Sequence, residues 1–343
     1  SGFYAKIQTS YATGEVSGSD KYVGDSLQVG GSHVGGLVGH ASYTHITNTY
    51  ATGKVTGKTK VGGLVGSSTA KVGQGFDRAK IQTSYATGMV SGSHDVGGLV
   101  GHADKTAITL SFWDNETTGL SQGIGESVDA IHNTSGATSE VNQLATFTGA
   151  TWNISADGNN DSVWRIYEGQ AAPLLRIFMK KVNVTGQAVT RDYNGKTDAT
   201  ISDLKFAETV KGVSVASSGI GQYADANAGE DKTVTFNINY ALADGETDLH
   251  TVLQRYDFVE PELKGTINKK ALTITAKDAS KTYGDTQTFD GTEFTADNLQ
   301  NGETISVNLT SAGAAKKADA GSYNITAAAT AAEGSGFNAD NYT

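Results

Sequence analysis

Residues 80–101 read KIQTSYATGMVSGSHDVGGLVG, and this stretch decides the fold because both of its halves recur. The first half returns as KIQTSYATG at residues 6–14 and as HITNTYATG at residues 45–53. The second half ends in GGLVG, which also stands at residues 35–39 and 62–66. Self-similarity of this kind predicts a repeat fold in which each copy is one structural unit.

The spacing of the two blocks predicts one coil of a stacked β-solenoid. In the second and third copies, Tyr50 and Tyr85 each stand 13 residues before the second glycine of GGLVG. Such a unit has about the length of one coil of a parallel β-helix, whose short strands stack about 4.8 Å apart. Extra residues around 19–30 and near 71–79 are predicted to be loop insertions at coil corners, where added length costs little.

Equivalent residues of successive coils are expected to lie over one another in columns, where each buries apolar surface against its own copy. Because a single coil cannot bury its own face, only the stack is stable. A fourth copy begins at Ile108 and then diverges. The predicted columns are Ile7, Ile46, Ile81 and Ile108; Val16, Val55 and Val90; Thr13, Thr52 and Thr87; and Tyr11, Tyr50 and Tyr85.

The composition fits short strands and excludes several partners. The 343 residues include 43 glycines, 2 prolines and no cysteine, and Val, Ile, Thr and Tyr recur between turn-forming residues. The net charge of −10 argues against nucleic-acid binding, which needs clustered Lys and Arg. Without a run of about 18 apolar residues, we expect no membrane insertion. Absent cysteine suits the cytosol, or a protein threaded unfolded through an outer-membrane pore.

The repeated blocks resemble the GLUG repeat, named for its Gly-Leu-x-Gly core, of large bacterial adhesins and some surface proteases. The resemblance covers roughly residues 3–178. Residues 111–114 (SFWD), 123–125 (GIG) and 164–170 (WRIYEGQ) look like the segment that closes such an array. Tryptophan occurs only there, at Trp113, Trp152 and Trp164, where we expect a cap over the last apolar layer of the solenoid.

A second, longer repeat follows Pro173. RDYNGKT at residues 191–197 is echoed by KTYGDT at residues 281–286, with a spacing of 90 residues between Tyr193 and Tyr283. The pair Ala228-Gly229 is echoed by Ala320-Gly321, 92 residues later. These units look like the YDG and MBG modules that recur in adhesin stalks.

The second copy stops before one expected strand. The first copy closes with Gly265-Thr266-Ile267, whereas the second reaches Thr343 before any equivalent segment. We therefore expect the natural protein to continue past Thr343 and this module to present an unpaired sheet edge.

These observations predict an all-β chain. Its first part is a right-handed parallel β-helix, or β-solenoid, at residues 1–125, with a terminator or cap at residues 126–180. Tandem small β-rich modules, of the β-sandwich or β-grasp-like type, then follow. A YDG-like module is expected at residues 181–269, and an MBG-like module, truncated at its C-terminus, at residues 270–343.

No catalytic residue and no cofactor are predicted. Hydrolases need a nucleophile or paired carboxylates in a pocket, and acidic residues are sparse among the coils. His40 and His102 follow equivalent GLVG blocks, and His33 and His94 precede equivalent Val-Gly-Gly segments. Either a stacked metal or proton site or plain descent of the repeat explains this pattern, and a metal needs three or four convergent ligands. The other histidines are His45, His132 and His250.

One loop has oxygen donors at alternating positions, as calcium loops do: Asp157, Asn159 and Asp161. The downstream bidentate Glu and the expected Gly are missing, so an Asx-rich turn is the preferred interpretation and calcium binding is the alternative. No metal site is therefore predicted.

The resemblance implies a structural or adhesive segment of an exported bacterial adhesin of the filamentous-haemagglutinin type, at the cell surface or secreted. Its implied partners are a host-cell or biofilm-matrix glycan or protein and, for the full-length protein, an outer-membrane secretion partner. One alternative is a non-catalytic carrier region of a surface protease or glycan-active enzyme. Another is a glycan-binding solenoid face built on the threonine or tyrosine column. The inserted loops are the first places expected to bind.

Overall fold

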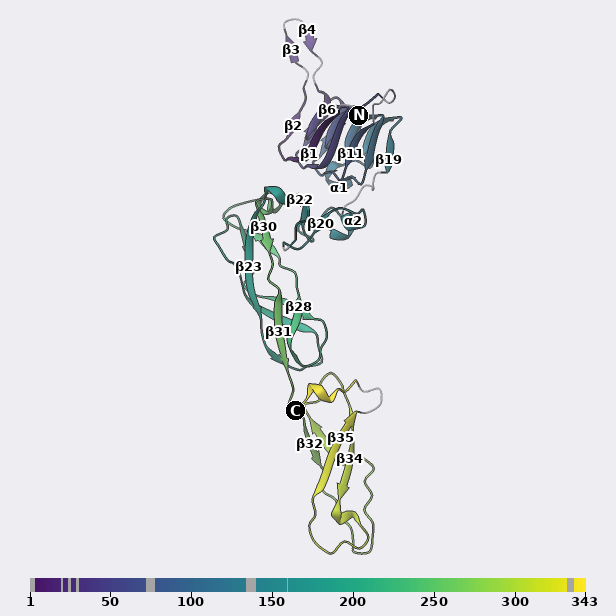
Figure 1. Cartoon of the computed structure of the whole chain (residues 1–343), viewed down its shortest axis with the longest axis vertical. Coiled ribbons are helices and arrows are strands. Elements are labelled where there is room, and N and C mark those ends of the chain that lie inside the picture. The colour runs from purple at the N-terminus through teal and green to yellow at the C-terminus, as the bar shows by residue number, and fades with distance from the viewer. Residues whose placement is uncertain are drawn as a thin grey trace. The chain divides into compact units, whose positions relative to one another are not determined.

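The computed structural model describes residues 4–19, 21–23, 26–28, 31–71, 78–133, 140–158, 160–331 and 336–343. The chain divides into two compact units. The first unit comprises Ser1–Val182, Lys211–Val213 and Ala241–Val259, and the second comprises Asn183–Val210, Ser214–Tyr240 and Glu260–Thr343. Both consist mainly of strands (Figure 1). Within the described ranges, no helix is both long enough and apolar enough to cross a membrane.

Strands at corresponding positions of successive repeats pair in parallel and form four stacked sheets. The first sheet contains β1 (Ala5–Ala12), β7 (Thr44–Ala51), β11 (Ala79–Gln82), β12 (Tyr85–Ala86), β16 (Thr106–Thr109), β17 (Phe112–Trp113) and β19 (Ile131–Asn133). The second sheet contains β6 (Val38–Ser42), β10 (Val65–Thr69), β15 (Val100–Asp104) and β18 (Ile124–Val128). The third contains β5 (Ser32–Gly35), β9 (Thr59–Gly62) and β14 (His94–Gly97), and the fourth contains β2 (Val16–Ser17), β8 (Val55–Thr56) and β13 (Val90–Ser91).

The predicted columns of isoleucine, valine and tyrosine are confirmed by the strand register. Ile46 pairs with Ile7 on one side and with Ile81 on the other, and Ile81 pairs in turn with Ile108. The side chains of Ile46, Ile81 and Ile108 are fully buried. The column of Val16, Val55 and Val90 forms in the same way. Parallel strands in register bring each residue over its own copy, so the repeat makes its own core.

The last glycine of the GLVG block holds two sheets together. A Cβ atom on Gly101 would collide with the backbone of β9 at Lys60 and Val61, and one on Gly125 would collide with β14 at Asp95 and Val96. The sheets therefore approach at these points more closely than any side chain allows. This contact brings His102, which follows Gly101, next to Lys60 of β9, and Glu126, which follows Gly125, next to Asp95 of β14.

Aromatic residues cover one side of the stack. Tyr11, Tyr50 and Tyr85 stack with ring centroids 5.1 Å apart. Trp164 of β21 (Trp164–Tyr167) lies 6.0 Å from both Tyr50 and Tyr85, and Trp152 continues the cluster at 4.9 Å from Trp164. The sequence predicted that the tryptophans cap only the last layer of the solenoid. Trp164 instead contacts two successive coils, so the aromatic cluster runs along the side of the stack.

Short elements complete the first unit. They are the hairpin strands β3 (Lys21–Val23) and β4 (Ser26–Gln28), α1 (Asn115–Thr118), α2 (Leu144–Thr148), β20 (Ile154–Ser155), β22 (Ala171–Leu175), η1 (Arg176–Phe178), α3 (Leu249–Leu253) and β30 (Tyr256–Val259). Strand β22 and the residue that follows α3 cover the tyrosine column. The Tyr85 hydroxyl donates to the Pro173 carbonyl of β22 at 2.6 Å, and Gln254, just after α3, donates to the Tyr50 hydroxyl at 2.5 Å.

The first β module of the second unit is built on one sheet. Its strands, in order, are β24 (Arg191–Asp192), β31 (Leu263–Asn268), β28 (Gly229–Thr235), β27 (Gly219–Tyr223), β25 (Asp198–Phe206) and β23 (Lys180–Ala188). Strand β31 is thus held on both sides, by β24 in parallel and by β28 antiparallel. Two further strands, β26 (Val213–Val215) and β29 (Tyr240–Leu242), pair with each other.

The second β module, residues 270–343, contains two antiparallel pairs. Strand β32 (Thr273–Ala276) pairs with β33 (Phe294–Asp297), and β34 (Ile305–Ser311) pairs with β35 (Ile325–Ala331). Its buried core is Ile305, Val307 and Leu309, and the 3-10 turns η2 (Ala312–Ala314) and η3 (Ala339–Asn341) follow β34 and β35. Among the described residues, no strand takes the place that β31 has in the first module.

Candidate functional site

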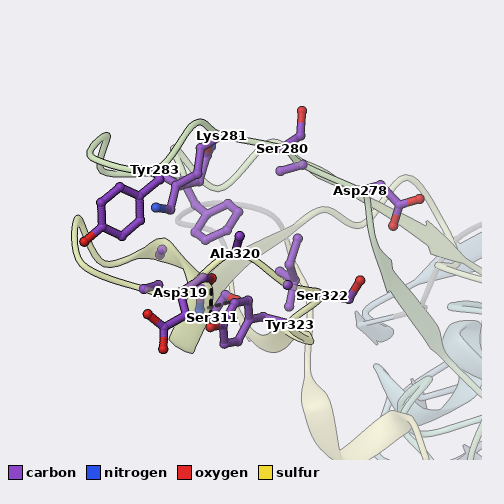
Figure 2. Close-up of a pocket in the computed structure, with 17 residues that line it drawn as sticks. Asp278, Ser280, Lys281, Tyr283, Ser311, Asp319, Ala320, Ser322 and Tyr323 are labelled. Atoms are coloured by element: carbon purple, nitrogen blue, oxygen red, sulfur yellow. Dashed lines mark hydrogen bonds between the residues drawn. The ribbon is translucent and has the colours of Figure 1, made fainter.

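A cavity of about 580 Å³ opens in the second β module (Figure 2). Residues 278–283 form one of its walls, and residues 311–325 contribute the opposite one. Figure 2 shows Lys281 and Tyr283 on the first wall and Asp319 and Tyr323 on the second. The floor includes the half-buried Phe289, which packs on the module core.

Tyr323 is a fixed part of this cavity. Its ring lies flat enough against Gly313 that a Cβ atom there would stand 2.5 to 2.9 Å from the ring atoms. Its hydroxyl donates to the Asp319 carbonyl at 3.0 Å, and 42% of the residue remains exposed. Tyr283, on the opposite wall, is 68% exposed. Exposed aromatic faces of this kind can stack on a sugar ring or cover an apolar side chain.

A second group of polar residues lies on the solenoid. Single ligand atoms of Asp95, His102 and Glu126 all stand within 4.8 Å of one another, and His102 Nδ1 is 2.6 Å from Glu126 Oε2. Imidazole and carboxylate groups suit a divalent transition metal. His102 and Glu126 pair across β15 and β18, and the close approach at Gly125 brings Asp95 beside them. The signal in the sequence is GIGE at residues 123–126, which aligns with GLVGH at residues 98–102.

The register corrects one predicted equivalence among the histidines. His33 occupies the same coil position as Lys60 and Asp95, whereas His94 aligns with Thr59. The valines Val34, Val61 and Val96 set this register because they are the apolar residues that the strands bury or half-bury. His40 and His102 do share a column, through Ser67. Burial and the nearby Lys60 lower the pKa of His33.

The predicted calcium loop is held by a guanidinium group. The Asp157 carbonyl and the Ser162 hydroxyl accept hydrogen bonds from Arg176, at 2.9 and 3.0 Å. Ser162 also donates its backbone N–H to the side chain of Asn160, at 3.1 Å, which is an Asx-turn contact. Asn159 lies outside the described residues. The alternative, calcium binding by Asp157, Asn159 and Asp161, stays untested.

The tyrosine column of the solenoid is less accessible than a binding face requires, whereas Thr13 is exposed and Thr52 and Thr87 are half-buried. Tyr50 and Tyr85 are fully buried, so the structural role predicted for the tyrosine column is confirmed for them. Thr13, Thr52 and Thr87 lie outside the strands, in the turns that follow β1, β7 and β12. The insertions expected at 19–30 and 71–79 fall partly outside the described residues.

A buried carboxyl group joins the two β modules of the second unit. Tyr193 of the first module and Tyr342 of the second both donate their hydroxyls to Glu303, which is only 7% exposed. Burial and the adjacent Glu303 raise the pKa of Tyr193 to about 12. Beside them, Asn341 accepts a hydrogen bond from the Ala228 backbone at 2.8 Å. We call this cluster the Glu303 junction; no sequence motif marks Glu303.

Stacked glycine-rich coils followed by tandem β modules define a modular repeat protein. Three protein families match parts of the chain: the GLUG motif at residues 30–56, the YDG domain at residues 179–249 and the MBG domain of the YGX type at residues 272–343. No curated protein and no solved structure matches it. These matches are consistent with an adhesin-like segment, as the repeats indicated, and modules of these kinds are typically non-catalytic and typical of extracellular or surface proteins.

Proposed function

We propose that this chain is a structural and adhesive segment of a large bacterial cell-surface adhesin and that it acts as a stalk. The three matched module types support the adhesin class. The Glu303 junction is the observation that carries the stalk role. A segment that holds a distant tip away from a cell has to keep successive modules at a fixed angle, and this junction ties one module to the next.

The junction resists bending because its donors come from both modules. Any bend that separates Tyr193 from Glu303 removes a hydrogen bond from a carboxyl group that water hardly reaches. A buried polar group that loses its hydrogen-bond partner costs about 1–3 kcal/mol. The contact between Ala228 and Asn341 would break in the same movement.

Distance measurements between two spin labels test the stalk role. The chain has no cysteine, so Lys205→Cys in the first module and Asn308→Cys in the second, both at exposed positions, give unique labels. We expect a single narrow distance distribution for this chain and a clearly broader one after Glu303→Gln. The matched control Glu230→Gln, at an exposed site on β28, should leave the distribution narrow. A distribution that is already broad without Glu303→Gln would refute the stalk.

The proposal includes a location outside the cell, export of the full-length protein by an outer-membrane secretion partner, and contact with a glycan or protein of a host cell or biofilm matrix. The occurrence of the matched modules in surface proteins supports this location. An array of glycans and matrix proteins, probed with the whole chain, tests the contact. Binding supports the adhesive role, and a blank array restricts the chain to the stalk role.

A further inference from the structure

Three side chains of metal-ligand type come together from three strands of the last two coils. Asp95 lies in β14, His102 in β15 and Glu126 in β18. One ligand atom of each lies within 4.8 Å of the other two. A tetrahedral Zn²⁺ ion bound at about 2.1 Å keeps its ligand atoms about 3.4 Å apart. Small side-chain rotations are therefore enough to bring all three atoms to one ion.

The cluster is partly shielded from water and open on one side. The His102 side chain is 12% exposed and that of Glu126 is 48% exposed, while Asp95 is half-buried. Partial burial strengthens the attraction between carboxylates and a cation because the effective dielectric is lower than in water. The exposed side at Glu126 gives an ion a path to the ligands.

The two carboxylates of the cluster have no fixed cation. Among the residues that the structure describes, neither Asp95 nor Glu126 forms an ion pair with a lysine or an arginine, and Glu126 pairs instead with the His102 ring. Lys60 precedes Asp95 in the same column, but the two side chains make no ion pair. Two uncompensated carboxylates match the charge of one divalent cation.

A buried hydroxyl group beside His102 points to the same site independently. Ser67 pairs with His102 across β10 and β15 and is 0% exposed, and its Oγ has no hydrogen-bond partner among the described residues. A buried hydroxyl without a partner is costly. When His102 Nδ1 binds a metal ion, the ring proton lies on Nε2 and needs an acceptor. Ser67 Oγ, on the adjacent strand about 4.8 Å away, supplies that acceptor.

The preceding coil shows that side chains, and not the backbone alone, make this cluster. There Lys60 and Ser67 occupy the coil positions of Asp95 and His102. Lys60 and Asp95 have nearly the same φ, 54° and 55°. The same corner thus accepts a lysine without changing its conformation, and only the coil with aspartate and histidine gathers metal ligands.

We propose that Asp95, His102 Nδ1 and Glu126 bind one divalent transition-metal ion of the Zn²⁺ type, with water in the fourth position. Among the described strands, β18 is the outermost of its sheet and pairs only with β15. The ion fastens β18 to β15 and β14 and acts as a clip on the last coil, where the repeat has diverged. The proposal is independent of the Glu303 junction and of the stalk role.

Zinc titration of the whole chain, purified without a histidine tag, tests the site. Isothermal titration calorimetry with ZnCl₂ should show one ion bound per chain. Hydrogen exchange, followed by mass spectrometry over Ile124–Val128, should slow by about tenfold or more when free Zn²⁺ stands at 100 times its dissociation constant. The reason is that the ion binds only when β18 is in place beside β15.

The repeat itself supplies variants that should still fold. Asp95→Lys introduces the residue that the preceding coil has as Lys60, and Glu126→Ser introduces the residue that the same column has as Ser67. Each should weaken zinc binding by about tenfold or more, because even the outer-shell partners of a metal site contribute about 10–100-fold. The matched control His40→Ser changes the same column in the first coil and should bind zinc as tightly as the unchanged chain.

Four results would overturn the proposal. They are no binding of zinc at one ion per chain, undiminished binding by both Asp95→Lys and Glu126→Ser, unchanged exchange in β18 at saturating zinc, and loss of binding in His40→Ser. The last result would place the ion on His33 and His40, whose rings lie 5.2 Å apart. Circular dichroism of each variant confirms its fold, and Glu126→Ser, at the most exposed ligand, keeps the test valid if Asp95→Lys fails to fold.

Discussion

Gly14, Gly53 and Gly88 occupy the same place in three successive coils, and replacing each with alanine isolates the effect of stacking. A Cβ atom on Gly53 would fall on the carbonyl oxygen of Gly14, and one on Gly88 would fall on that of Gly53. A Cβ atom on Gly14 meets nothing within 4 Å. None of the three has the positive φ that would itself exclude alanine, so the three substitutions differ only in what lies beneath.

The magnitudes follow from this difference. At Gly53 and Gly88 the added methyl meets backbone, which can move only if the whole coil moves, and overpacking of this kind costs about 1–3 kcal/mol or more. At Gly14 the unfolded chain loses freedom without a clash in the fold, which stabilises by about 0.4–1 kcal/mol. For a unit of this size, 2 kcal/mol corresponds to a fall in melting temperature of about 4–8 °C.

Tryptophan fluorescence during urea unfolding is the suitable assay, because Trp113, Trp152 and Trp164 all belong to the first unit. We expect Gly53→Ala and Gly88→Ala to lower the unfolding midpoint and Gly14→Ala to leave it unchanged or raise it. Equal effects at all three sites would mean that the coils do not lie over one another, and the reasoning would fail.

Three further predictions concern buried polar groups. Tyr85→Phe removes the hydroxyl that donates to the buried Pro173 carbonyl and should cost the first unit about 1–3 kcal/mol in urea unfolding, whereas Tyr11→Phe, at an exposed site, should cost little. Burial lowers the pKa of His250, so as the pH falls the unfolded chain takes up a proton before the folded chain does. The melting temperature of the first unit should therefore drop below pH 6.5, and His250→Phe should reduce that drop, leaving the smaller part due to His33. The pKa of Tyr193 is raised to about 12, so the stability of the second unit should be intact below pH 10 and decline between pH 10 and 12; circular dichroism at these pH values should show a smaller decline for Tyr193→Phe.

The solenoid could be predicted because its evidence is repeated in the sequence. Ile46 and Ile81 stand in equivalent blocks, and parallel pairing in register puts equivalent residues in contact. In such a stack, residues at equivalent positions of the repeat have the same surroundings, so residues that align in the sequence also lie over one another in the structure. The cap was harder to foresee. Gln254 reaches Tyr50 across 204 residues, and no period connects two segments so far apart.

The candidate sites were less predictable because each combines a repeated residue with an unrepeated one. Tyr193 belongs to the repeated tyrosine motif, but its partner Glu303 has no motif around it. His102 likewise descends from the repeat, while Asp95 replaces Lys60 at its coil position, and Glu126 replaces histidine at its own. Reading the repeat for its departures as well as its matches would have singled out both acidic residues.

Charge explains why residues 241–259 fold with the first unit although they lie within the predicted YDG-like module at residues 181–269. Arg165 and Arg176 of the cap are 1% and 9% exposed, and both approach Asp257 of β30, at 3.4 and 2.8 Å. A buried arginine without its counter-ion costs about 3–5 kcal/mol. The cap therefore requires the later segment, and its aromatic cover over the tyrosine column depends on a carboxylate about 80 to 90 residues further along the chain. The boundary of the first folding unit therefore depends on the ion pairs of Asp257 and does not coincide with the end of the sequence repeat.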